Sequence, residues 1–178
     1  MSEPTPSRSL VGAAILRDPL VCELLAMRLI GVLATLEPDG SVHAVPMWLA
    51  PGDGVILLAT GSRSRKVRNL DRDPRATLVL HDSRPGFEVC GTSIQGHIEF
   101  VRGADATQLV DRVHRRYVSA GGERLAAAAE FFASDDVALR LTPSVAVLWD
   151  ERASDAARVL REAGATLPLE PTFSREDG

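Results

Sequence analysis

The sequence contains few cysteines, one lysine and few aromatic residues, and these shortages exclude several kinds of protein. Two cysteines in 178 residues cannot form a disulfide framework, and their spacing matches no zinc motif. The four histidines lie too far apart along the chain to form a local set of metal ligands. A net charge of -4 argues against a general nucleic-acid or membrane-surface binder. We therefore predict no metal site and no nucleic-acid or membrane partner.

Long apolar runs are also missing. Arg17, Asp18, Glu23 and Arg28 interrupt the apolar N-terminal part, so no signal-peptide core fits there. No apolar run approaches the length of a membrane span. The sequence therefore predicts a cytoplasmic protein.

Lysine is nearly absent, because Lys66 is the only lysine among 20 basic residues. Every other Lys or Arg position is occupied by arginine. A compact ammonium at this one position can approach an anion without the width of a guanidinium. This singles out the surroundings of Lys66 as a candidate site.

The length suits one domain with short appendages. Asp18 is placed to cap a helix that begins at Pro19. We predict a flexible segment over residues 1–17, a β-barrel domain over 18–150 and a C-terminal helix and tail over 151–178. Ser154 is the expected cap of that last helix.

The order of patterns predicts strands with short helices between them. The predicted strands are Leu29–Leu36, Ser41–Leu49, Val55–Thr60, Ala76–His81, Phe87–Val101 and Val137–Trp149. The predicted helices are Ser64–Asp73, Asp105–Tyr117 and Glu123–Ala133, and a loop is expected over Asp82–Gly86. No Gly-x-Gly-x-x-Gly follows the first strand, which disfavours a Rossmann fold.

Turn residues indicate how the strands connect. Glu37–Gly40 fits a type I turn with a glycine bulge, so the first three strands should form an antiparallel meander. Gly91 and Gly96 predict a bulge or bend in the long strand, and Pro143 predicts an edge or bulge in the last one. We predict a mainly β (α+β) fold, a six-stranded antiparallel Greek-key barrel with short flanking helices.

Four cations crowd the start of the helix that Ser64 is expected to cap: Arg63, Arg65, Lys66 and Arg68. Cations oppose the positive end of a helix dipole, and an anion bound there removes the conflict. A phosphate suits the combination of backbone N–H groups, a hydroxyl and basic side chains. The alternative is an ordinary basic patch on a surface helix. No glycine precedes the lysine, so the segment is not a P-loop.

The sequence resembles the pyridoxamine 5′-phosphate oxidase-like family of flavin- and deazaflavin-binding split β-barrels. The resemblance extends over roughly residues 18–150 and keeps the order and spacing of the family's motifs. The matching segments are Gly31–Leu36, Asp39–Gly40, His43–Trp48, Thr60–Leu70 and Asp73–Arg75.

The resemblance implies a homodimer of the FMN-binding split-barrel type, with the cofactor at the subunit interface. Arg65 and Lys66 would clasp the cofactor phosphate, which Thr60, Ser64 and Arg63 would also bind. The residues expected along the tricyclic ring are Val45, Pro46, Met47 and Trp48. For Met47 and Trp48, ordinary core positions are the alternative.

The resemblance also places Trp149 and Arg152 near the partner chain's site. It implies an oxidoreductase in which FMN or the deazaflavin coenzyme F-420 carries the hydride to or from a small unsaturated or quinone-like substrate. No catalytic side chain is assigned. The arginine-rich C-terminal segment of the true pyridoxamine phosphate oxidases is missing, so pyridoxamine phosphate is not the expected substrate.

Two questions stay open at the level of sequence. The deazaflavin has a polyanionic tail that Arg63, Arg68, Arg72 and Arg75 could bind, although arginines at 72 and 75 could instead pair with neighbouring aspartates. The other class of function is a non-catalytic module that stores or binds a flavin or haem. His43 or His97 would then be the candidate axial ligand.

Overall fold

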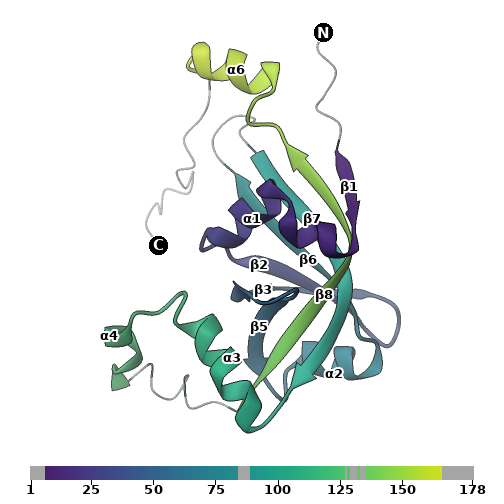
Figure 1. The fold of residues 1–178 in the computed structure, drawn as a ribbon, viewed down its shortest axis with the longest axis vertical. Helices are drawn as coiled ribbons and strands as arrows, with labels where there is room; N and C mark the ends of the chain where they lie inside the picture. Colours follow the sequence, from purple (N-terminus) through teal and green to yellow (C-terminus); the bar gives the residue numbers. More distant parts are fainter. Residues whose placement is uncertain (1–6, 84–88, 127, 129–131, 133–134, 166–178) are drawn as a thin grey trace, which may run out of the picture.

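The structure is a computed structural model that describes residues 7–83, 89–126, 128, 132 and 135–165 (Figure 1). The described N-terminal residues form β1 (Arg8–Val11), the 3-10 helix η1 (Gly12–Arg17) and α1 (Pro19–Ala26). β1 pairs with the last strand, and Ile15 of η1 is fully buried in the core. The prediction of a flexible segment over residues 1–17 is therefore wrong for residues 8–17.

Asp18 fixes the start of α1 as predicted. Its Oδ1 accepts hydrogen bonds from the backbone N–H groups of Leu20, at 3.0 Å, and Val21, at 3.4 Å. Arg8 of β1 donates to both carboxylate oxygens of Asp18. The guanidinium of Arg8 is the main cause that holds the pKa of Asp18 below its usual value. Asp18 thus joins β1 to α1.

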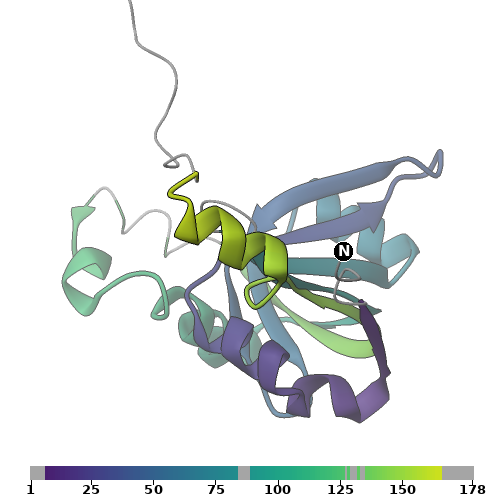
Figure 2. The same cartoon turned by 90° about the horizontal axis from the view of Figure 1, so that it is seen from above.

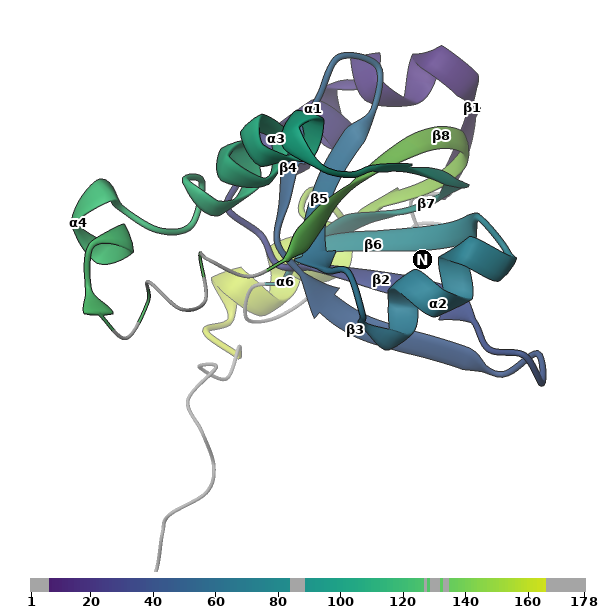
Figure 3. The same cartoon turned by 90° about the horizontal axis from the view of Figure 1, so that it is seen from below.

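The remaining strands are β2 (Gly31–Leu36), β3 (Val42–Met47), β4 (Leu49–Pro51), β5 (Ile56–Gly61), β6 (Arg75–Ser83), β7 (Val89–Val101) and β8 (Asp136–Asp150). They form one antiparallel sheet in the order β3-β2-β6-β7-β8-β5-β4, and β1 pairs with β8 away from this path. The sheet curls around a common centre, with α3 beside β4 and β5 and with α2 beside β2 and β3 (Figure 3). This arrangement confirms the predicted split barrel, with eight strands among the described residues in place of the six predicted.

The strand predicted over Ser41–Leu49 is interrupted at Trp48. β3 pairs with β2, whereas β4 pairs with β5, so the expected three-stranded meander is wrong. The reason is the curl of the sheet: one residue carries the chain from one end of the strand order to the other. The β2–β3 hairpin itself extends to one side of the molecule (Figure 2) and turns at Glu37–Gly40 as predicted, with Gly40 at φ 84°.

The long strands meet at a bulge. Gln95 pairs with Val145 and Gly96 pairs with Pro143, so Ser144 is the extra residue in β8. This confirms the bend predicted from Gly96 and Pro143. Gly91 lies in regular pairing opposite Trp149, whose ring fills the space that a Cβ at Gly91 would take.

The helices that follow the first strands are α2 (Arg65–Arg72), α3 (Ala104–His114), α4 (Ala120–Glu123) and α6 (Asp155–Glu162). The Ser154 hydroxyl caps α6 by accepting a hydrogen bond from the Ala157 N–H at 3.2 Å, as predicted. Parts of the helix predicted over Glu123–Ala133 and of the loop predicted over Asp82–Gly86 lie outside the described residues. Among the helices that the structure describes, none is long and apolar enough to cross a bilayer.

The interior has a main core and a smaller one. Leucines and isoleucines of α1 and of the strands fill the main core together with Val67 and Leu70 of α2. α3 packs on the other surface of β5, where Leu57 contacts Val113 and Trp48. Cys90 is fully buried in the main core, where it packs as a small apolar residue. The start of α2 and the β3–β4 junction lie side by side and line one cavity.

Candidate cofactor site

The turn between β5 and α2 brings together the hydroxyl and ammonium groups predicted to bind a phosphate. Ser64 occupies the N-cap position of α2, but its side chain makes no capping hydrogen bond. The Lys66 Nζ donates instead to Thr60 Oγ1 at 2.8 Å, and Thr60 Oγ1 lies 3.4 Å from Ser64 Oγ. These three side chains form a short hydrogen-bonded chain that ends in a cation.

Lys66 is half-buried, which differs from the exposed position expected of a residue on a polar helix. Burial lowers the pKa of its ammonium, and the nearby carboxylate of Asp136 acts in the opposite direction. A partly desolvated cation attracts an anion more strongly than a solvated one. Lys66 is therefore well placed to bind a negatively charged group.

A cavity of about 340 Å³ opens beside this ammonium. Pro46, Met47 and Trp48 from the β3–β4 junction form one part of its lining. The remaining lining residues are Ala59, Thr60, Gly61, Lys66, His114 and Asp136. The cavity thus combines an apolar wall, suited to a flat ring, with a polar end suited to a phosphate.

Trp48 is held in place from two sides. Its ring stacks on that of Tyr117 with centroids 5.0 Å apart and meets the ring of His114 edge-on at 5.9 Å. The Tyr117 hydroxyl donates to the carbonyl of Leu29 at 2.7 Å and accepts from the N–H of Leu49 at 3.3 Å. The end of α3 therefore fixes the apolar wall of the cavity.

His114 and Asp136 belong to the site although the sequence analysis did not select them. His114 Nε2 lies 3.4 Å from Asp136 Oδ2, with side-chain exposures of 6% and 10%. Asp136 pairs with Gly61 across β5 and β8, which puts its carboxylate beside the turn predicted to bind a phosphate. The β5–β8 pairing joins segments that are far apart in the sequence. Without it, the sequence contains no sign that Asp136 belongs to the site.

Arg65 does not share the cavity with Lys66. Its Nε lies 3.5 Å from Glu37 Oε1, and it lines a separate hollow on the β2–β3 hairpin. Consecutive residues on a helix point about 100° apart, which explains the separation. Arg63 is exposed, and its carbonyl accepts a hydrogen bond from Arg68 Nη1 at 2.7 Å. Arg65 and Lys66 thus line different cavities, and their joint binding of a phosphate stays a prediction.

Three other predicted residues lie elsewhere in the single chain. Val45 packs against the main core. Trp149 covers Gly91 near the far end of β8. Arg152 forms ion pairs with Glu23 and Asp150, both at 2.6 Å, and these pairs attach α1 to the end of β8. A role for Trp149 at the cofactor stays a prediction that needs a second chain.

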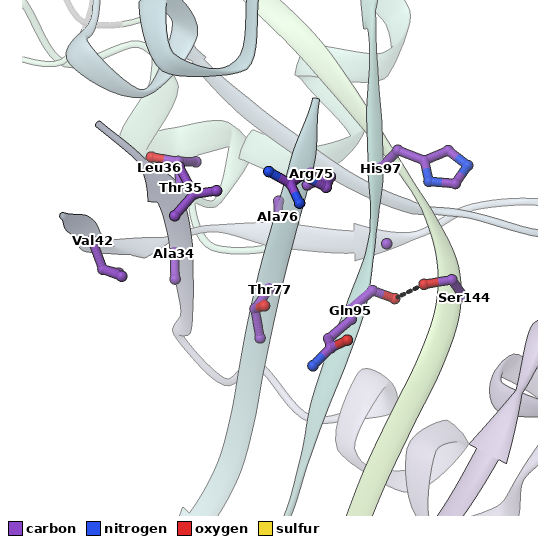
Figure 4. A pocket seen from close by; sticks show the side chains of 11 residues that line it. Ala34, Thr35, Leu36, Val42, Arg75, Ala76, Thr77, Gln95, His97 and Ser144 are labelled. Atoms are coloured by element: carbon purple, nitrogen blue, oxygen red, sulfur yellow. Dashed lines mark hydrogen bonds between the residues drawn. The ribbon is translucent and has the colours of Figure 1, made fainter. Parts of the chain in front are cut away.

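A second cavity, of about 360 Å³, lies on the surface of the sheet over β2, β6 and β7 (Figure 4). Arg75, Gln95 and His97 are among its polar lining residues. The Arg75 guanidinium is bound to Asp73, with an Nη2–Oδ2 distance of 2.6 Å. Thr60 and Lys66 line the first cavity and not this one, so these two groups of the predicted phosphate site lie beside the first cavity.

Comparison with known proteins places the chain in a family. A family model described as pyridoxamine 5′-phosphate oxidase matches residues 18–159. The chain belongs to this family. The match covers both sides of the cavity, from β3 and β4 through α2 to β8. A search of curated proteins gave no match.

Solved structures with the same fold include several that match most of the chain. The conserved hypothetical protein Rv2991 from Mycobacterium tuberculosis is 28% identical, with a TM-score of 0.62 over 88% of this chain and 92% of that one. A structure titled F420 reductase is 26% identical, with a TM-score of 0.52 over 70% and 93% of the two chains. The haem storage protein HutZ from Vibrio cholerae is 16% identical, with a TM-score of 0.59 over 76% and 97%, and at that identity it shows the fold alone.

The residues present in this member of the pyridoxamine 5′-phosphate oxidase family fit a phosphorylated flavin-type cofactor. Thr60, Ser64 and Lys66 can donate hydrogen bonds to phosphate oxygens. Pro46 and Trp48 offer apolar surface to a ring. The histidines considered for haem, His43 and His97, lie outside this cavity: His43 Nδ1 is 4.0 Å from Glu37 Oε1, and His97 lines the second cavity.

Proposed function

We propose that the protein is an oxidoreductase that binds FMN or the deazaflavin coenzyme F-420 in the cavity beside Lys66. The observation that carries this proposal is the joint placement of the half-buried Lys66 ammonium, the Thr60 hydroxyl bound to it and the Pro46–Trp48 wall around one cavity, with the Ser64 hydroxyl next to Thr60. The bound cofactor would exchange a hydride with a small unsaturated or quinone-like substrate. The chain itself would bind the phosphate, orient the ring and exclude water.

The geometry assigns separate tasks to the two sides of the cavity. Thr60 holds the Lys66 ammonium in a fixed position, so the cation does not need to be ordered when an anion binds. Trp48 is already ordered by its stacking on Tyr117. A preorganised site of this kind loses little conformational entropy on binding.

The deazaflavin is the cofactor that we favour. The F420 reductase structure is 26% identical and covers 70% of this chain. The tail-binding role considered for Arg75 receives no support, because Asp73 already neutralises its guanidinium. The preference for the deazaflavin over FMN therefore rests on the similarity to the F420 reductase structure and not on the arginines.

Titration of the purified protein with each cofactor tests the proposal. We expect FMN or F-420 fluorescence to change saturably, and we expect the reduced complex to transfer a hydride to a quinone. Riboflavin, which lacks the phosphate, is the matched control and should bind at least about ten-fold more weakly, because a charge-assisted hydrogen bond contributes about 1.5–3 kcal/mol. If neither cofactor binds, the proposed function is contradicted.

A haem-binding module of the same fold is the second candidate. His114 lines the cavity and could in principle be an axial ligand, but its Nε2 faces the Asp136 carboxylate at 3.4 Å. This contact favours a flavin-type cofactor over haem. A haem Soret band that appears on addition of haemin and disappears in His114→Ala would favour the haem module instead.

We also propose that the protein is a homodimer, as the family resemblance implies. Several exposed valines lie on one face of the sheet: Val11, Val42, Val145 and Val147. The strand registers place them on the same side, because Val145 pairs with both Val11 and Gln95, and Gln95 pairs with Thr77. An exposed apolar face of this kind is typical of a protein–protein interface. Trp149 lies on the same face of β8 as Val147.

Replacing Val147 by Glu is expected to convert the dimer to a monomer, because it puts a charge in the middle of an apolar interface. Light scattering should give twice the chain mass of 19.1 kDa for the original protein and the single mass for the variant. Val159→Glu on α6 is the matched control, since Val159 is also exposed but lies outside the sheet. A monomeric original protein would contradict the proposed dimer.

A further inference from the structure

The cavity beside Lys66 has an unusual charge balance for a phosphate site. Among the described residues that line it, Lys66 is the only Lys or Arg and Asp136 is the only carboxylate. The nearby arginines lie elsewhere, since Arg65 pairs with Glu37 and Arg63 is exposed. An incoming phosphate therefore meets a positive and a negative charge together.

Asp136 cannot easily move its charge out of the cavity. Its backbone is fixed opposite Gly61 in the β5–β8 ladder, and one carboxylate oxygen lies 3.9 Å from the position that a Cβ on Gly61 would occupy. The other oxygen faces His114 Nε2 at 3.4 Å. With side-chain exposures of 6% for His114 and 10% for Asp136, solvent screens this pair weakly.

The two candidate cofactors differ in the charge of their phosphate. FMN ends in a phosphomonoester, which carries about −1.5 to −2 at pH 7 with a second pKa of about 6. F-420 has a phosphodiester between its ring portion and its tail, and a diester carries a single negative charge at any pH above its low pKa. Repulsion by Asp136 and attraction by Lys66 both grow in proportion to this charge, so the two contributions largely offset each other. The cost of removing the anion from water grows even faster, with the square of the charge.

We propose that Asp136, held by His114, is a specificity-determining residue through which the cavity selects a phosphodiester over a phosphomonoester. This inference rests on the proposed function and deepens it, because it names the class of phosphate that the site takes. Lys66 neutralises one negative charge, so a diester leaves the cavity with only the charge of Asp136. A dianionic monoester leaves one further negative charge uncompensated beside Asp136.

Among the described residues that line the cavity, the charged and titratable groups beside Asp136 come from two other elements. Lys66 comes from α2, His114 from α3 and Asp136 itself from β8, whereas the β3–β4 junction contributes Pro46, Met47 and Trp48. Only the titration of the FMN phosphate distinguishes the two cofactors.

The test compares Asp136→Asn with the original full-length chain, with FMN and F-420 as probes and fluorescence titration as the readout. At about pH 8 the substitution should tighten F-420 binding by about ten-fold and FMN binding by about a hundred-fold, because the Coulomb energy scales with the product of the charges. For each cofactor, the dissociation constant of the variant is compared with that of the original protein. Differences between the rings of the two cofactors therefore cancel. Asp135→Asn is the matched control, since Asp135 is the adjacent carboxylate, bonds to the Ser62 hydroxyl at 2.6 Å and does not line the cavity.

A second measurement uses the original protein and needs no variant. Between about pH 5.5 and about pH 8, FMN binding should weaken by a larger factor than F-420 binding, because the FMN phosphate becomes dianionic across this range. Equal changes for the two probes, or an Asp135→Asn effect as large as that of Asp136→Asn, would overturn the inference. Absence of binding by both probes to the original protein would instead contradict the proposed function, and with it this inference.

Discussion

Replacing Lys66 by Met is expected to weaken cofactor binding by about 10- to 150-fold, which corresponds to the loss of one charge-assisted interaction of about 1.5–3 kcal/mol. Lys66 is the basic side chain on the lining of the cavity, and Thr60 holds its ammonium at 2.8 Å. Methionine keeps the length and the apolar stem of lysine, so the half-buried stem should still pack. Fluorescence titration with F-420 or FMN measures the change.

Arg65→Met is the matched control for this prediction. Arg65 is the adjacent cation, but it is bound to Glu37 and lies outside the cavity. Its replacement should change the dissociation constant much less than Lys66→Met does. If the two variants lose affinity equally, Arg65 leaves Glu37 when the cofactor binds, and the separation of the two side chains in this structure has no bearing on affinity.

Replacing Gly96 by Ala is expected to lower the free energy of unfolding by about 3 kcal/mol or more, as overpacking at a rigid position does. A Cβ at Gly96 would overlap the carbonyl oxygen of Thr142 and lie 3.0 Å from a methyl group of Leu141. The obstacle is backbone of the neighbouring strand at the bulge, so a side-chain rotation cannot relieve it. Thermal unfolding should show a Tm lower by about 6–12 °C for a chain of this size.

Gly121→Ala provides the comparison at an unobstructed position. A Cβ there would meet only the Ser119 hydroxyl, at 3.8 Å, which is an ordinary contact. This variant in α4 should keep the Tm or raise it slightly, because alanine favours a helix over glycine. A Gly96→Ala protein as stable as Gly121→Ala would show that the bulge can rearrange to admit a methyl group.

Features that depend on neighbouring residues could be predicted from the sequence. Asp18 and Ser154 cap their helices, Gly40 closes the hairpin turn, and Gly96 lies at the bulge, each for a reason contained within a few residues. The split barrel itself followed from the order of these elements together with the family resemblance.

Features that depend on distant pairing could not be predicted in the same way. The break at Trp48 arises because the two ends of the strand order meet there, and the local pattern over residues 41–49 contains no sign of it. His114 and Asp136 join Lys66 only through the packing of α3 and the pairing of β5 with β8. The basic cluster was recognised as a unit, but the helix directs Arg65 and Lys66 to different places.

The central position of β8 has a consequence for biosynthesis. This strand pairs with β1, β5 and β7, yet it is the last strand to leave the ribosome. At about 5–20 residues per second, Leu148 is made roughly 7–28 s after Arg8, with which it pairs. Until then β2 can pair with β3 and β6, β6 with β7, and β4 with β5, but β1 lacks its partner and β5 and β7 each keep one edge unpaired. The nascent chain therefore passes through a period in which strand edges are unpaired. A chaperone would bind these exposed edges during that period.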